Sequence, residues 1–285
     1  MPSTLPSRLR SPAALPPVRS VGLLQPLTWL ALAWRDLCRA PALGFAHGLV
    51  LALLGAAILA LGHNRFWLMA GALSGFLVIG PVVATSLYAI SRALERGEPV
   101  GPGLVRQTWT RWQSGHAGGQ RHAGYWCLVR FGLLLSLAAT GWVVVSASLI
   151  TVLSPVQVQT PMDFLHHVVL AGDGRLFALW LALGSFLAAP IFASSVVAMP
   201  LLLERRVGVW QAVLTSWTVV LANPAPMALW AALIVLFTLL GLGSLLIGLV
   251  AVVPMLGHAS WHAYRDLVDA SGLAPREPLE PGRAL

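Results

Sequence analysis

The stretch GFAHGLVLALLGAAILALG, residues 44–62, decides the class of fold. It holds no charged residue, and its length matches the roughly 20 apolar residues with which a helix crosses the hydrocarbon core of a bilayer. In lipid every backbone N–H and C=O group must find a partner within the protein, and a helix satisfies them within one segment. The sequence therefore predicts a membrane-spanning helix at this point.

The composition of the whole chain also indicates a membrane protein. Hydrophobic residues make up 57% of the chain and charged residues 10%, with a mean hydropathy of +0.78. So few charges cannot cover the surface of a soluble globule of this size. All 18 basic residues are arginine, which excludes chemistry that depends on lysine. The arginines lie between apolar runs, so the net charge of +8 indicates orientation in a membrane, and we expect no nucleic-acid partner.

Further apolar runs predict an all-α membrane protein of about six transmembrane helices. Three more runs have spanning length; they are residues 66–90, 127–153 and 176–203. The stretch 226–264 has 39 residues without a charge, too long for one span. Glycine and serine at 241–244 suit a tight turn near its middle. We therefore predict two short spans, 226–240 and 244–264, with a single tilted helix as the alternative.

The positions of the arginines predict the orientation. With the N-terminus inside the cell, six spans leave only Arg65 and Arg175 of the 18 arginines outside. We therefore expect a multi-pass protein of the bacterial inner membrane with both termini in the cytoplasm. Residues 1–22, rich in proline and arginine, are expected to form a disordered tail, residues 23–269 the membrane domain and residues 270–285 a flexible tail.

Segments that precede the spans have the apolar spacing of amphipathic interfacial helices. The first stripe is Leu23, Leu27, Leu30, Trp34 and Leu37, the second is Trp210, Val213, Leu214, Trp217 and Leu221, and a weaker third is Val105, Trp109 and Trp112. Proline disfavours helical geometry in the residue before it. Ala40-Pro41 and Asn223-Pro224 are therefore predicted corners at which a surface helix turns into a span.

These elements fit a threefold internal repeat of one interfacial helix and one two-span hairpin. The three units are residues 23–96, 103–206 and 209–269. Pro81 precedes Glu95 by 14 residues, and Pro190 precedes Glu204 by the same 14. Chance similarity between apolar helices of low complexity is the alternative explanation.

Four segments resemble a bacterial family of predicted integral membrane proteins of unknown function. They are LTWLALAWRDL at 27–37, GFLVIGP at 75–81, SRALERG at 91–97 and GHASWHAYRDL at 257–267. The resemblance covers most of the chain beyond residue 22 and implies a polytopic inner-membrane protein without an assigned activity. Some family members carry the label of a cytochrome c oxidase subunit. That label needs several histidine ligands inside the spans, and only His47 and His258 lie at any depth.

Histidines near the C-terminus form the first candidate site. His258, His262 and Arg265 fall on one face of a helix, and His47 lies at a matching depth in the first span. We expect a polar seam that packs against the first span or holds an anionic lipid headgroup, because arginine presents a planar fork of donors to phosphate. Two histidines at i and i+4 can share a metal ion, but a catalytic site needs a third ligand, and no acidic residue is expected at this depth. We therefore expect neither a metal ion nor a cofactor.

Charged residues at the inner ends of two spans form the second candidate site. Glu95 lies between Arg92 and Arg96, and Glu204 is followed by Arg205. A helix C-terminus disfavours a carboxylate unless a cation is close. The simpler interpretation is a structural ion pair at each position, and the alternative is a clamp to a neighbouring surface helix. The arginines available for such a clamp are Arg35, Arg39 and Arg106.

Three functions are compatible with these features. A non-catalytic scaffold or accessory factor is favoured, because ion-driven transporters normally carry an acidic residue or histidine within a span and the middles of the first five spans have none. A small permease or lipid-handling protein is the first alternative, suggested by the internal repeat. An accessory redox subunit is the second. The expected partners are the lipid bilayer, an anionic phospholipid, and either a second copy or another membrane protein.

Overall fold

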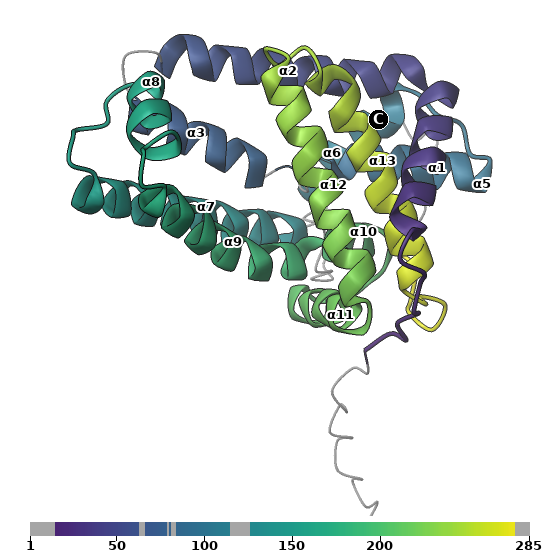
Figure 1. Ribbon diagram of the computed structural model, residues 1–285. Coiled ribbons are helices and arrows are strands. Elements are labelled where there is room, and N and C mark those ends of the chain that lie inside the picture. Colours follow the sequence, from purple (N-terminus) through teal and green to yellow (C-terminus); the bar gives the residue numbers. More distant parts are fainter. Residues whose placement is uncertain (1–14, 63–65, 79, 81–83, 115–125, 277–285) are drawn as a thin grey trace, which may run out of the picture.

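The computed structural model describes residues 15–62, 66–78, 80, 84–114 and 126–276 (Figure 1). Within these ranges the chain is helical, with two isolated β-bridges and no strand, which confirms the all-α class. Four segments of the described chain are long and apolar enough to cross a membrane. They are Pro41–Gly62, Cys127–Leu153, Arg175–Glu204 and Pro224–Gly243.

The helices follow one another in the order in which Figure 1 labels them. Their bounds are α1 (Gln25–Arg39), α2 (Pro41–Gly62), α3 (Phe66–Val78), α5 (Thr85–Arg96), α6 (Pro102–Ser114), α7 (Trp126–Leu153), α8 (Pro161–Phe164), the π-helix η1 (Leu165–Val169), α9 (Arg175–Ser195), α10 (Ala198–Glu204), α11 (Val209–Ala222), α12 (Pro224–Gly243) and α13 (Leu249–Leu267).

Three predicted breaks lie where proline or glycine indicated them. α1 gives way to α2 at Ala40, and α11 gives way to α12 at Asn223. The stretch 226–264 is divided between α12 and α13, which are separated by residues 244–248, so the single tilted helix is excluded. The expected span 66–90 is different, because its described parts belong to two helices, α3 and α5, each too short to cross a bilayer alone.

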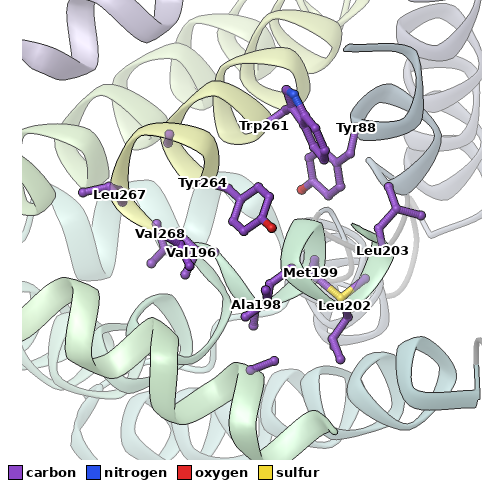
Figure 2. Packing of buried hydrophobic residues seen from close by; sticks show 14 of the residues in the cluster. Tyr88, Val196, Ala198, Met199, Leu202, Leu203, Trp261, Tyr264, Leu267 and Val268 are labelled. Atoms are coloured by element: carbon purple, nitrogen blue, oxygen red, sulfur yellow. The ribbon is translucent and has the colours of Figure 1, made fainter. Parts of the chain in front are cut away.

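α13 lies at the centre of the bundle. It packs against α1, α2, α5, α10 and α12, so helices from both ends of the sequence meet on it (Figure 1). Trp261 and Tyr264 of α13 are both 0% exposed; Tyr264 points towards Met199 of α10, and Trp261 lies beside Tyr88 of α5 (Figure 2). The main hydrophobic core therefore forms where the second half of α13 meets α10.

α7 and α9 run side by side away from this core, with α3 packed against α7 (Figure 1). Their large apolar side chains are mostly directed outwards; Leu137 is 71% exposed and Phe186 is 75% exposed. An apolar surface that extends along two helices is unfavourable in water, but it suits contact with lipid chains.

α1 divides its expected apolar stripe between two faces. Leu30 and Leu37 of the stripe are buried against the bundle, together with Trp29, which the stripe did not include. Leu27 and Trp34 are 47% and 53% exposed on another side of the helix. α1 therefore packs on protein with one face and presents a second apolar face outwards, as an interfacial helix does towards lipid.

α11 shows the same division with smaller side chains. Ala212, Thr215 and Ser216 are each 0% exposed, whereas Trp210 and Leu221 are each 73% exposed. Small residues let α11 approach α9 and α10 closely, which is how helices pack in membranes. The large apolar residues of the stripe are left facing outwards.

Parts of both expected tails are ordered against the bundle. The Arg19 N–H donates to the Leu267 carbonyl at 2.8 Å, and the Asp269 N–H donates to the Pro17 carbonyl at 2.8 Å. On the C-terminal side, the Arg276 N–H donates to the Glu204 carbonyl at 2.9 Å. Residues 15–22 and 270–276 are therefore joined to the bundle by backbone hydrogen bonds that their composition did not indicate. Residues 1–14 and 277–285 lie outside the described part.

The close packing of α2 on α13 gives a direct test of the fold. A Cβ added at Gly48 would collide with the backbone carbonyl of Val250. We expect Gly48→Ala to lower the thermal stability of the detergent-purified protein, although alanine in a helix interior normally gains about 1 kcal/mol over glycine. At Gly141 of α7 no atom lies within 4 Å of such a Cβ, so Gly141→Ala should leave stability unchanged or raise it. Equal shifts for the two variants would contradict the packing.

Candidate functional site

A buried carboxylate joins three helices. Asp36 of α1 is 2% exposed, and its Oδ2 accepts hydrogen bonds from Ser91 Oγ of α5 and His262 Nε2 of α13, both at 2.8 Å. Burial by itself raises the pKa of Asp36, but the hydrogen bonds from His262 and Ser91 and the charge of His262 outweigh it and hold the pKa below its ordinary value. The ionised carboxylate thus ties α1 to both other helices.

The hydrogen-bond pattern extends from Asp36 to His258. Ser91 has one hydroxyl hydrogen, which goes to Asp36, so His258 Nδ1 must be the donor to Ser91 Oγ at 2.7 Å. The Nε2 atom of His258 is then an acceptor; it is buried and has no hydrogen-bond partner among the described residues. His258 is therefore oriented by Ser91 and, through it, by Asp36.

His47 is satisfied separately. Its Nδ1 donates to the Leu43 carbonyl at 2.7 Å, because a carbonyl only accepts, and its Nε2 accepts from Ser86 Oγ at 2.6 Å. No hydrogen bond joins His47 to His258 or His262 in the described structure. The expected polar seam thus consists of two neighbouring groups, one around Asp36 and one around His47.

Glu204 is the centre of a second buried cluster. It is 2% exposed, accepts from Tyr264 Oη at 2.6 Å and from Arg96 Nη2 at 2.9 Å, and pairs with Arg205 Nε at 3.4 Å. Arg265 Nη1 is 3.7 Å from the same carboxylate. The cluster therefore connects α5, α10 and α13 through a carboxylate that water does not reach.

Glu95 belongs to a more exposed pair. Its side chain is 39% exposed, and its Oε1 is 2.9 Å from Arg265 Nη2. Trp261 Nε1 donates to Glu95 Oε2 at 3.0 Å. Arg265 thus bridges Glu95 and Glu204, whereas Arg35, Arg39 and Arg106, considered for a clamp to a surface helix, form no ion pair or hydrogen bond with either glutamate in the described structure. Arg92, beside Glu95 in the sequence, is buried.

A groove of about 320 Å³ lies between α1, α5 and α13. Its lining consists of Gln25, Trp29, Leu32, Arg35, Asp36, Arg39, Ser91, Glu95, His262, Arg265 and Asp266. Of these charged groups, Asp36 is bonded to His262, and Glu95 is paired with Arg265. Arg35 and Arg39 are exposed and form no hydrogen bond or ion pair with the described residues. The groove therefore offers two guanidinium groups that are free to bind an anion.

Sequence reasoning identified His262 and Arg265 in this groove but missed Asp36 and Ser91. The expectation that no acidic residue reaches the depth of the histidines is wrong, because α1 packs along α13 and brings Asp36 to His262. A signal existed, since Asp36 is the only acidic residue of α1 and lies on the same side as Trp29 and Ala33. Within the described ranges, no group of three or more histidine, cysteine or acidic side chains is arranged to hold a metal ion.

Residues 68–204 match the model of a known protein family. Its description is predicted integral membrane protein (DUF2189). The function of the DUF2189 family is unknown. The matched region supplies Ser91, Glu95 and Glu204 but ends before α13 and begins after α1, so Asp36 and His262 lie outside it. No curated protein and no solved structure matches the chain.

Glu95 and Glu204 occupy equivalent places in the sequence, but we expect them to contribute differently to the free energy of unfolding. Glu204→Gln should lower the free energy of unfolding by about 1–3 kcal/mol, because it removes the buried charged acceptor of the hydrogen bonds from Tyr264 and Arg96. Glu95→Gln should cost less than about 1 kcal/mol, because the pair with Arg265 is solvent-exposed. Denaturant unfolding of the purified variants compares them, and similar losses would contradict the cluster.

Proposed function

We propose that this chain is a non-catalytic, multi-pass accessory protein of the inner membrane that holds the phosphate of a phospholipid headgroup. The observation that carries the proposal is the pair Arg35 and Arg39 on the groove, since neither guanidinium group has a partner among the described residues. They are four residues apart on α1 and so lie on one side of the helix. Guanidinium groups bind phosphate through charge and paired hydrogen bonds.

Exposed apolar side chains on a neighbouring face of α1 support a lipid as the ligand. Trp34, next to Arg35 in the sequence, is 53% exposed, and Leu27 on the same side of α1 is 47% exposed. A headgroup bound to the arginines would leave its acyl chains beside these residues. Leu32 on the groove itself adds apolar surface at its edge.

We also propose six crossings, with both termini in the cytoplasm, built from the three repeated units, in which α3 and α5 together make the second crossing. One feature that supports the repeat is the backbone at the two predicted corners: φ and ψ are −132° and 55° at Ala40, and −132° and 54° at Asn223. The excess of arginine on one side of the predicted spans supports the orientation. Reporter fusions after Leu285 and within residues 155–170 should report opposite sides of the membrane, and the same side for both would contradict six crossings.

Phosphatidylglycerol binding tests the proposed function. The full chain, delipidated in detergent, is titrated with phosphatidylglycerol and the bound lipid is measured by native mass spectrometry. The double variant Arg35→Gln/Arg39→Gln should weaken binding at least about tenfold, because each lost charge-assisted contact contributes about 1.5–3 kcal/mol.

The matched control is Arg106→Gln/Arg130→Gln. Both of these arginines are exposed and lie outside the groove, so this variant removes the same charge elsewhere. Its affinity should stay within about twofold of the wild type, since nonspecific attraction by exposed charge is weak at physiological salt. Equal losses in the two double variants, or no loss in either, would contradict a site at the groove.

A further inference from the structure

We propose that the groove selects a phospholipid whose headgroup carries a primary ammonium as well as a phosphate, the chemistry of phosphatidylethanolamine. This inference rests on the proposed function and adds the second half of the headgroup. It follows from the charged side chains of the groove that form no ion pair with another side chain of the groove.

Asp266 is the acidic residue of the groove that has no cationic partner among the described residues. Asp36 is bonded to His262, and Glu95 is paired with Arg265. Asp266 Oδ2 accepts one hydrogen bond, from the neutral indole Nε1 of Trp29 at 3.0 Å, and no ion pair joins it to any described residue. Its carboxylate therefore has acceptor capacity left over for a cation.

The leftover charges are arranged on opposite walls. Arg35 and Arg39 come from α1, and Asp266 comes from the last turn of α13. The bond between Trp29 and Asp266 holds the two walls together at this point. A ligand that bridges the groove thus meets positive charge on one side and negative charge on the other, which matches a zwitterion in one orientation only.

A headgroup without an ammonium fits less well. The phosphate of phosphatidylglycerol would meet both arginines, but its glycerol hydroxyls would replace the water around Asp266 without supplying charge. Leaving a partly desolvated carboxylate unpaired is unfavourable. The groove volume, about 320 Å³, lies at the lower end of small-molecule sites, which span roughly 300–1,000 Å³, and suits a single headgroup.

The test compares lipids with identical acyl chains. Delipidated full-length protein in detergent is titrated with phosphatidylethanolamine, phosphatidylglycerol and phosphatidylcholine, and bound lipid is counted by native mass spectrometry. We expect phosphatidylethanolamine to bind at least fivefold more tightly than either of the others, because the quaternary ammonium of phosphatidylcholine has no N–H to donate to Asp266. Glycerophosphoethanolamine, which lacks the acyl chains, should bind at least tenfold more weakly than the lipid.

Variants at Asp266 separate this inference from the proposed function. Asp266→Asn should remove the preference for phosphatidylethanolamine while leaving phosphatidylglycerol binding unchanged or stronger, and Asp266→Glu should keep the preference. Asp173→Asn, at an exposed position outside the groove, is the matched control and should keep it too. The double variant Arg35→Gln/Arg39→Gln should weaken the binding of all three lipids.

The outcomes are distinct. The inference would be overturned if the wild type bound the three lipids equally, or if the Asp266→Asn variant still preferred phosphatidylethanolamine. It would also be overturned if phosphatidylcholine bound as tightly as phosphatidylethanolamine, or if glycerophosphoethanolamine bound as tightly as the lipid. If the arginine variant still weakens binding in those cases, the phosphate site stands. If the arginine variant changes nothing, the proposed function fails together with the inference.

Discussion

The structure depends on one buried carboxylate. Asp36 is the polar residue on the buried side of α1, and an ionised carboxylate in that position is tolerated only when it accepts hydrogen bonds. Ser91 and His262 supply those bonds from α5 and α13. Asp36 therefore fixes the relative positions of α1, α5 and α13, which are far apart in the sequence. The groove is the outer side of this junction.

The same junction explains why charged groups remain available. His262 is paired with Asp36, and Glu95 is paired with Arg265. These pairs fix the walls of the groove relative to each other. Arg35 and Arg39 are on the side of α1 that turns away from the core, so they do not join these pairs. A rigid frame with free guanidinium groups at its edge is what a preorganised anion site requires. The exposed apolar residues of α1 then favour a lipid over a soluble anion as the ligand.

Sequence patterns located most helices and half of the site. Runs of apolar residues predicted α2, α7, α9 and α12, because hydropathy reports what a bilayer demands of each segment alone. The division of 226–264 at glycine and serine was also predicted. Asp36 was missed because its partners are 55 and 226 residues away, and periodicity within one helix carries no information on which helix packs against it. Glu95 and Glu204 looked equivalent in sequence, but only Glu204 is enclosed by other helices.

The coupling between Asp36 and His262 tests the central claim most directly. It is measured by a double-mutant cycle with Asp36→Asn and His262→Gln, using denaturant unfolding of the purified full-length protein. Direct contact at 2.8 Å predicts that the free energies of unfolding are non-additive by about 0.5–3 kcal/mol, with the double variant less destabilised than the sum of the single variants. Additivity within about 0.3 kcal/mol would contradict the junction of α1 with α13 on which the groove depends.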